Sequence, residues 1–243
     1  MPMPLREERI LGCDLSMNHG AFVLLSGEGA ELDLLYYTKI KAAAALFKGS
    51  GFCLALPTSE DPIQRDLERL ERLGRVFHAV LDRMKPTRIA LEGYSFDSKQ
   101  AAHQIGEVAG FFKLCAFVRG LPIRVYAPGQ LKKFTTGNGA ADKAEMLAAV
   151  VASYHRDYSS LAWKTDSPAE DCADARAAAE FLLTELRVRA GALRLSDLGP
   201  KELEVFNSVG KGRREGLAAS AFVQRSGEPA LAELLASIAR AGE

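Results

Sequence analysis

Four carboxylates stand where an α/β fold gathers its functional groups. Asp14 ends an apolar run at residues 9–14 (RILGCD), and Glu92 ends another at residues 88–92 (RIALE). Functional side chains of an open sheet collect beyond the carboxyl ends of its strands, so these two acids would share a crevice if their strands are neighbours. Asp171 and Asp174 are three residues apart, a spacing that makes them neighbours on one helix face.

These four acids together would offer hard oxygen ligands suited to Mg²⁺ or Mn²⁺. Two such ions, about 3.5–4 Å apart, can bind the attacking and leaving oxygens of phosphodiester hydrolysis. Each acid also has an ordinary explanation, because Asp14 and Glu92 could be solvated loop acids and the helical pair could complement the helix dipole. The spacing alone leaves both interpretations open.

The elements that would position these acids follow an α/β order. Strand-forming residues occupy five segments: 9–14, 21–26, 32–40, 88–92 and 122–126. Helical spacing or composition marks four more: 62–83, 99–118, 140–154 and 168–189. Ser167, Pro168 and Glu170 have the pattern of an N-cap and capping box at the start of the last helix. This order predicts a mixed sheet that begins with antiparallel strands.

The composition is that of an ordinary globular protein. The 243 residues carry 31 basic and 31 acidic side chains, so the formal net charge is zero, and 48% of the residues are hydrophobic. This balance excludes a disordered chain and a small disulfide-stapled domain. No apolar run approaches the ~18–20 residues of a membrane span, and the first ten residues lack the features of a signal peptide. The four cysteines form no CxxC pair, which indicates reduced thiols.

The stretches around the acids resemble a known nuclease family. Tyr126-Ala127-Pro128, followed by residues 130–133 (QLKK) and 136–143 (TGNGAADK), resembles the central signature of the RuvC-type Holliday-junction resolvases. Three further stretches resemble the family's first strand, fourth strand and acidic last helix, in the same order: 10–14 (ILGCD), 89–92 (IALE) and 171–175 (DCADA). By this resemblance the chain is identified as a divergent or phage-encoded member of that family, within the RNase H-like nuclease superfamily.

The resemblance carries expectations about fold, cofactor and partners. It implies an α/β, RNase H-like, five-stranded mixed sheet flanked by helices, with a helical C-terminal extension. It makes the four acids the ligands of Mg²⁺ or Mn²⁺, with two ions per active site, and it puts Lys143 near the scissile phosphate. It also implies a homodimer acting on branched DNA, located in the nucleoid or in the cytoplasm of a phage-infected cell, without a membrane partner or a nucleotide cofactor.

A basic stretch favours contact with DNA phosphates. Residues 111–143 hold six basic side chains against the single acid Asp142: Lys113, Arg119, Arg124, Lys132, Lys133 and Lys143. The turn Gly137-Asn138-Gly139 would let backbone N–H groups approach a phosphate ahead of a helix. A solvated basic face is the alternative. By resemblance, Tyr94 or Phe96 would be the aromatic wedge that enters the junction.

The chain departs from the family pattern in three places. Leu15-Ser16 replaces the family's usual Pro-Gly or similar tight turn, an insertion occupies about residues 42–56, and a tail follows Gly191. We therefore predict a nuclease domain at 1–190 and an extension at 191–243, with an amphipathic helix at 229–240. The histidines show no metal-ligand spacing, and only His103 is a weak site candidate.

The leading hypothesis is a metal-dependent, structure-selective endonuclease. It would resolve Holliday junctions by paired symmetric nicks in DNA recombination and repair. A non-catalytic branched-DNA-binding protein of the same fold and a nuclease that prefers forks or flaps are the alternatives. A P-loop or actin-like ATPase is disfavoured, since the sequence has no G-x-x-x-x-G-K-[ST] motif and no second phosphate loop.

Overall fold

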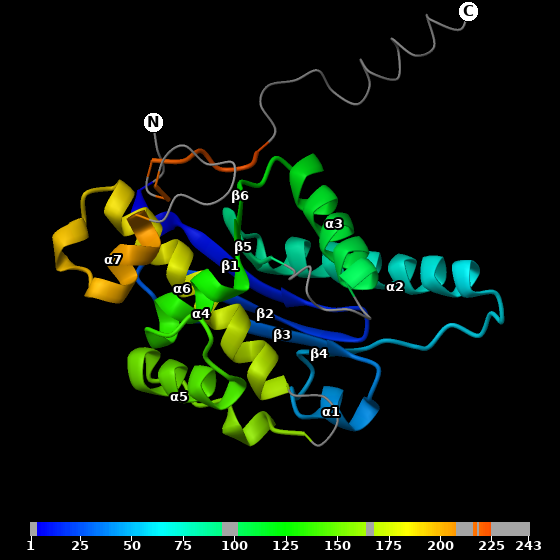
Figure 1. The fold of residues 1–243 in the computed structure, drawn as a ribbon. Helices are drawn as coiled ribbons and strands as arrows, with labels where there is room; N and C mark the ends of the chain where they lie inside the picture. The colour runs from blue at the N-terminus through cyan, green and yellow to red at the C-terminus, as the bar shows by residue number, and fades with distance from the viewer. Residues whose placement is uncertain (1–3, 94–101, 164–167, 208–215, 218, 225–243) are drawn as a thin grey trace, which may run out of the picture.

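A six-stranded mixed sheet, in the order β4-β3-β2-β1-β5-β6, forms the centre of the computed structural model (Figure 1). The structure describes residues 4–93, 102–163, 168–207, 216–217 and 219–224. The strands are β1 (Arg9–Leu15), β2 (His19–Ser26), β3 (Glu31–Thr38), β4 (Gly51–Cys53), β5 (Arg88–Glu92) and β6 (Ile123–Tyr126). The first three strands pair antiparallel, whereas β5 runs parallel to β1 and β6 runs parallel to β5.

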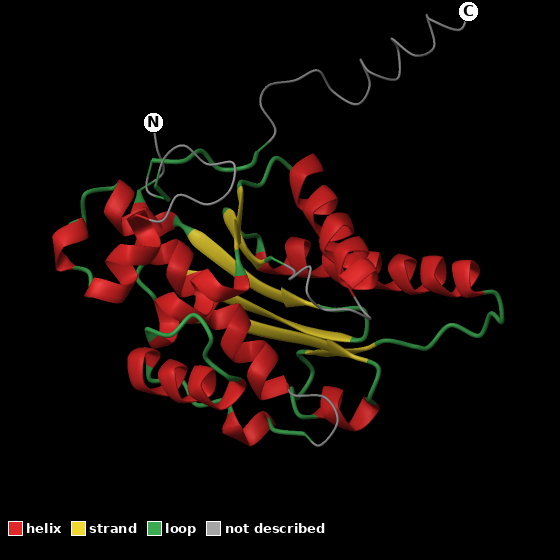
Figure 2. Cartoon of the chain, in the orientation of Figure 1, coloured by secondary structure: helices red, strands yellow, loops and turns green. Residues whose placement is uncertain are grey.

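Helices cover both faces of this sheet (Figure 2). One face carries α2 (Pro62–Met84) and α3 (Ala102–Val118). The other carries the following three helices: α4 (Pro128–Thr136), α5 (Lys143–Tyr154) and α6 (Pro168–Arg189). Two short helices complete the described part, α1 (Lys41–Ala45) and α7 (Pro200–Asn207). None of the helices within the described ranges is both long and apolar enough to span a membrane.

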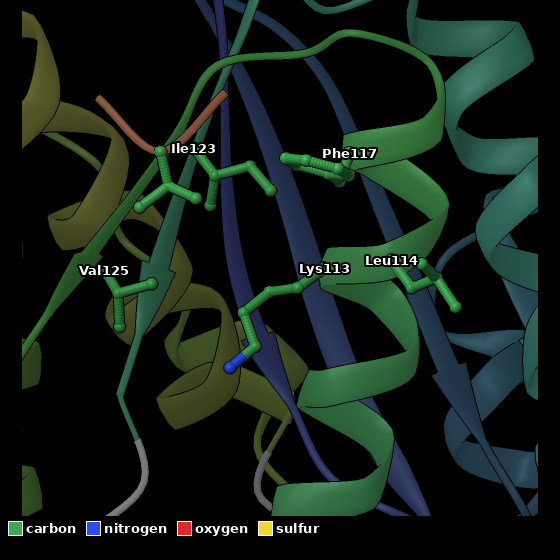
Figure 3. A pocket seen from close by; sticks show the side chains of 6 residues that line it. Lys113, Leu114, Phe117, Ile123 and Val125 are labelled. Atoms are coloured by element: carbon green, nitrogen blue, oxygen red, sulfur yellow. The ribbon is translucent and has the colours of Figure 1, made fainter. Parts of the chain in front are cut away.

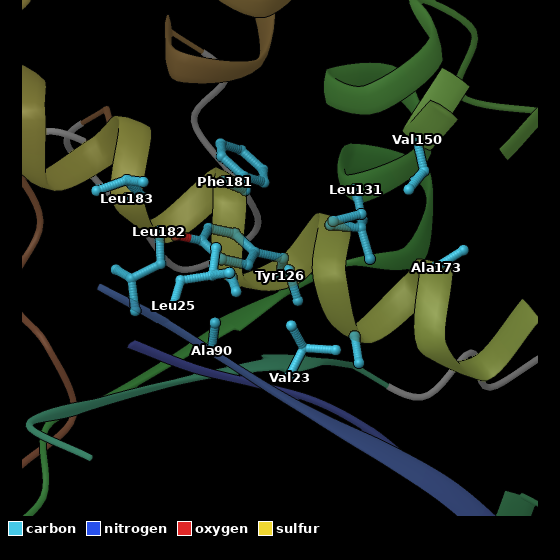
Figure 4. Close-up of a cluster of buried hydrophobic side chains, with 14 of the residues drawn as sticks. Val23, Leu25, Ala90, Tyr126, Leu131, Val150, Ala173, Phe181, Leu182 and Leu183 are labelled. Carbon is cyan, nitrogen blue, oxygen red and sulfur yellow. The ribbon is translucent and has the colours of Figure 1, made fainter. Parts of the chain in front are cut away.

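The central strands are apolar on both faces because both faces are covered. In β1, Ile10 packs on the α6 side and Leu11 on the α2–α3 side, and both are fully buried. The α6 side is filled by stacked rings, with the centroids of Tyr126 and Phe181 4.1 Å apart (Figure 4). This sandwich fixes the sheet between two helical layers.

Helix α6 lies unusually close to β1. A Cβ added to Gly12 would lie 1.9 Å from the carbonyl oxygen of Ala175 and 2.8 Å from the Cβ of Ala179. Glycine in the strand and alanine in the helix are therefore what allow the two backbones to approach. The consequence is that the first turns of α6, with Asp171 and Asp174, lie over the sheet.

The expected α/β fold is confirmed, with two differences. The sheet has six strands rather than five, because the predicted insertion contributes β4, which pairs parallel to β3 at the sheet edge. Helix α4 was not predicted, although Pro128 at its first turn and Gly137 just past its end are ordinary helix boundaries. Helix α5 begins at Lys143 rather than residue 140, because Asp142 caps it by accepting a hydrogen bond from the backbone N–H of Glu145.

The described part of the tail packs against the rest of the chain. Val205 and Phe206 of α7 are buried in the core on the α6 side, and Val223 forms an isolated antiparallel bridge with Ile123 of β6. The division at residue 190 stays a prediction. The helix predicted at residues 229–240 and the capping role predicted for Ser167 lie outside the described residues.

Candidate active site

Neighbouring strands bring two of the predicted acids together. In the parallel pair β1–β5, Cys13 lies opposite Leu91. The next residues, Asp14 and Glu92, therefore lie side by side where these strands end. Helix α6 crosses β1 and β2 and supplies Asp171, which is 5% exposed.

Three of the four carboxylates have raised pKa values, and the charge of Asp171 contributes to each of these shifts. Burial raises the pKa of Asp14 well above its ordinary value, and the charges of Asp171 and Glu92 add to that shift. Burial raises the pKa of Asp174 to about 8, with contributions from Glu92 and Asp171. Burial also raises the pKa of Glu92 to about 7, although the charge of Lys132 opposes that shift. Acids that repel one another at a buried position form a group that a cation would stabilise.

The acids are not arranged as a closed ligand shell. Among the described residues, no three His, Cys, Asp or Glu side chains are spaced so that they could hold one metal ion as they stand. Their mutual electrostatic effects nevertheless identify them as one group of carboxylates, and an all-oxygen donor set is the kind that Mg²⁺ and Mn²⁺ prefer. The chemistry of the donor set therefore fits a hard divalent cation.

Two residues that the sequence reasoning missed contact Asp171. His19 Nδ1 lies 2.7 Å from Asp171 Oδ2, and the hydroxyl of Tyr36 donates a hydrogen bond of 2.9 Å to the same oxygen. His19 begins β2, so the β1–β2 hairpin returns it to the end of β1, close to Asp14. The sequence signal that could have identified His19 is its position in a hairpin directly after the strand that contains Asp14.

Lysines approach the acids from α4 and α5. Lys132 of α4 is near enough to affect the ionisation of Glu92 and Asp174. Lys143 is the first residue of α5, and its ammonium group is ion-paired with Glu170 of α6. The hydrogen bond to Glu170 raises the pKa of Lys143.

The glycine turn before α5 is held by its own hydrogen bonds. Gly137 ends α4 with φ +80°, a conformation that favours glycine. The backbone N–H of Asn138 bonds to Thr136 Oγ1, and that of Ala140 bonds to Asn138 Oδ1. The N–H of Gly137 bonds to the carbonyl of Lys133. The prediction that the turn leaves its donors open to a phosphate is therefore wrong for Gly137 and Asn138, while the N–H of Gly139 forms no such bond within the described part of the chain.

The predicted basic stripe is not one surface. Arg124 is only 3% exposed and forms a buried ion pair with Glu185 of α6. Arg119 lies 2.8 Å from Asp82 of α2, and Lys133 pairs with Glu204 of α7. Counting charges along the sequence could not reveal these partners, because they belong to elements distant in the sequence.

Other predicted positions add little to this site. Lys113 lines an apolar groove of about 440 Å³ between α3 and β6, together with Phe117 and Val125 (Figure 3). His103 lies near the start of α3 and is exposed. The proposed wedges Tyr94 and Phe96 lie outside the described residues.

Comparisons with known proteins all point to the same family. Residues 53–179 match the family model described as crossover junction endodeoxyribonuclease RuvC. The RuvC of Halorhodospira halophila is 34% identical over 113 residues, which cover 45% of this chain and 63% of that protein. The RuvC of Anaeromyxobacter sp. is 36% identical over 86 residues, which cover 34% of this chain and 46% of that protein. The chain thus spans about half to two thirds of the length of these relatives.

Solved structures agree on the fold. The Thermus thermophilus RuvC structure matches with a TM-score of 0.50 and 22% identity, covering 76% of this chain and 97% of that one. The structure of T. thermophilus RuvC in complex with a Holliday junction substrate matches with the same TM-score and 23% identity. Since the family model covers just over half of the 243 residues and the fold agrees, the chain belongs to the RuvC family.

Proposed function

We propose that this protein is a metal-dependent, structure-selective endonuclease that resolves Holliday junctions by paired symmetric nicks. The observation that carries the proposal is the group of acids from β1, β5 and α6, in which burial and mutual repulsion raise the pKa values of Asp14, Glu92 and Asp174. Such perturbed acids are costly for stability, which favours a functional reason for keeping them. Membership of the RuvC family supports the same activity.

The proposal places two Mg²⁺ or Mn²⁺ ions in each active site. The ligands would be the carboxylates of Asp14, Glu92, Asp171 and Asp174. A divalent ion bound there would activate water and stabilise the charge that develops on the phosphate. A bound cation also favours the ionised form of each acid, which offsets the raised pKa values.

The chain's own cations would complete the site. We assign Lys143 to the scissile phosphate, because its side chain is 70% exposed and its ammonium group lies on the side of the acids. Its pairing with Glu170 holds the ammonium group there in the absence of DNA. Lys132 and Gly139, the remaining glycine of the turn, would bind the DNA backbone nearby, with Lys133 beside Lys132 on α4.

The partner we propose is a four-way junction bound by a homodimer. Two active sites related by a two-fold axis suit paired symmetric nicks. Helix α3 exposes Leu114 by 56% and Val118 by 53%, and we assign the dimer contact to this apolar face. Either Tyr94 or Phe96 would be the wedge at the junction centre.

The test is cleavage of a labelled four-way junction beside linear duplex and a fork, with Mg²⁺, Mn²⁺ or EDTA. We expect symmetric, metal-dependent nicks in the junction, and a loss of at least about 10²-fold in Asp14→Asn. Glu71→Gln is the matched control, because Glu71 forms an exposed pair with Arg75 on α2. Equal cleavage of the fork would broaden the substrate, and tight junction binding without any cut would leave a binding protein.

A further inference from the structure

We propose that His19 and Tyr36 are positioning residues for Asp171, and that they commit one of its two oxygens so that the other is presented to the metal or the substrate. The inference rests on the proposed function, because it assigns a role toward the same group of acids. It adds two residues that the sequence motifs do not contain.

The geometry concentrates both donors on a single atom. The distances from Asp171 Oδ2 are 2.7 Å to His19 Nδ1 and 2.9 Å to the hydroxyl of Tyr36. A carboxylate oxygen has two lone-pair positions, so these two donors occupy Oδ2. The remaining capacity of the carboxylate is on Oδ1. A side chain held in this way cannot rotate to exchange its oxygens without breaking two hydrogen bonds.

The turn between β1 and β2 fixes His19. The hydroxyl of Ser16 donates a 2.7 Å hydrogen bond to the carbonyl of His19, and the N–H of Ser16 donates to the same carbonyl at 3.0 Å. The hydroxyl of Tyr37 donates a 2.6 Å bond to the carbonyl of Ser16, which ties the turn to β3. Ser16 belongs to the Leu15-Ser16 pair that departs from the family's first motif, so this departure builds the support for His19.

The insertion fixes Tyr36. The ring of Tyr36 is fully buried and stacks on Phe47, with centroids 4.7 Å apart and an interplanar angle of 10°. Phe47 lies within the insertion at residues 42–56, just after α1. Two places where this chain departs from the family pattern therefore converge on one carboxylate. Hydrogen bonds behind a ligand typically change metal affinity or activity by about 10- to 100-fold.

The test compares Mn²⁺ affinity, measured by titration calorimetry on the full chain without DNA, with the Mg²⁺ dependence of junction cleavage. We expect Tyr36→Phe and His19→Ala each to weaken Mn²⁺ binding by about 10-fold and to raise the Mg²⁺ needed for cleavage. His19→Asn should recover most of the affinity, because its amide nitrogen can reach the position of Nδ1. The double variant should lose less than the product of the single losses, since both donors hold the same oxygen.

Matched controls remove equivalent groups elsewhere. Tyr158→Phe deletes a buried hydroxyl that donates a 3.0 Å bond to Glu31, and His78→Ala deletes a histidine of α2. Both controls should keep the wild-type affinity for Mn²⁺.

Three results would overturn the inference: wild-type Mn²⁺ affinity in both Tyr36→Phe and His19→Ala, an equal loss in Tyr158→Phe, or no Mn²⁺ binding by the wild type. If His19→Ala fails to fold, the Mn²⁺ affinities of Tyr36→Phe and His19→Asn still test the inference. A wild type that binds Mn²⁺ through these residues yet cuts no junction would sink the endonuclease proposal and leave the positioning role intact.

Discussion

At the scale of single residues, the acids of the site govern how the stability of the protein depends on pH, because they are buried together. An acid whose pKa is raised on folding binds protons more tightly in the folded state than in the unfolded chain. Its contribution to stability is complete below the unfolded pKa, near 4, and is lost as the pH rises through the folded pKa. For Glu92 and Asp174 the folded values are about 7 and about 8. The metal-free protein should therefore lose stability between about pH 4 and pH 8.

Asp174→Asn should reverse part of this loss. At pH 8 the amide removes a repelled, partly ionised group, so we expect the metal-free variant to be more stable than the wild type by about 1–3 kcal/mol. That corresponds to a rise in Tm of about 3–10 °C for a chain of this size. At pH 5, about one unit above the unfolded pKa, less of the wild type's stability has been lost, so the variant's advantage in stability should be smaller than at pH 8.

The measurement is the Tm of the wild type and of Asp174→Asn in EDTA at pH 5 and pH 8, repeated with Mg²⁺ as a second condition. Mg²⁺ should stabilise the wild type more than the variant, because the variant lacks one of the proposed ligands. A variant that melts below the wild type at pH 8 in EDTA would contradict the assignment of Asp174 to a group of repelling acids.

At the scale of elements, part of the site follows from the sequence and part does not. Asp14 and Glu92 could be predicted as neighbours, because each ends an apolar run and parallel strands end at the same edge. The contact of Tyr36 with Asp171 could not be predicted. The face of the sheet on which the Tyr36 side chain lies depends on the register of β3 against β2, and this register shifts between Leu24 and Leu25. Arg124 was mistaken for a surface cation, because its partner Glu185 is 61 residues away on α6.

The close approach of β1 and α6 makes Gly12 a sensitive position. Gly12→Ala places a Cβ against the backbone of Ala175, so α6 must shift outward. We expect a loss of about 1–3 kcal/mol or more in the free energy of unfolding. Cleavage should fall as well, because Asp171 and Asp174 move with the helix.

Gly110→Ala is the matched control for that change. Gly110 lies within α3, and an added Cβ there meets nothing within 4 Å. Alanine is the better helix former, so this variant should be unchanged or more stable by about 0.5–1 kcal/mol. Urea unfolding of both variants gives the comparison, and equal midpoints for Gly12→Ala and the wild type would show that α6 is not tightly seated on β1.

At the scale of the whole molecule, the tail closes the edge of the sheet. Strand β6 ends the strand order, and an unpaired edge of this kind invites association with another chain. The bridge between Val223 and Ile123 covers part of it. Arg124 donates hydrogen bonds to the carbonyls of Ser220 and Ala221, so the tail is also held from the side of the sheet.

Phe222 is the centre of this attachment. Its ring lies 4.3 Å from the guanidinium carbon of Arg124, 4.8 Å from that of Arg189 and 5.0 Å from that of Arg88. A cation over an aromatic ring contributes about 0.5–2 kcal/mol, depending on how dry the site is. The carboxylate of Glu185 pairs with both Arg124 and Arg189, so the same charges that hold the tail are anchored in α6.

Phe222→Ala should therefore loosen the tail without dismantling the core. We expect a loss of about 1–3 kcal/mol in urea unfolding, since the variant gives up the ring's burial and its contacts with three cations. Glu185→Gln should cost more, about 3–5 kcal/mol, because it leaves the buried Arg124 without its carboxylate. Leu195→Ala, at an exposed position of the same tail, is the control and should stay within about 0.5 kcal/mol of the wild type. If Phe222→Ala and Leu195→Ala unfold at the same urea concentration, the tail contributes nothing to the stability of the sheet, and its attachment through β6 is not part of the folded unit.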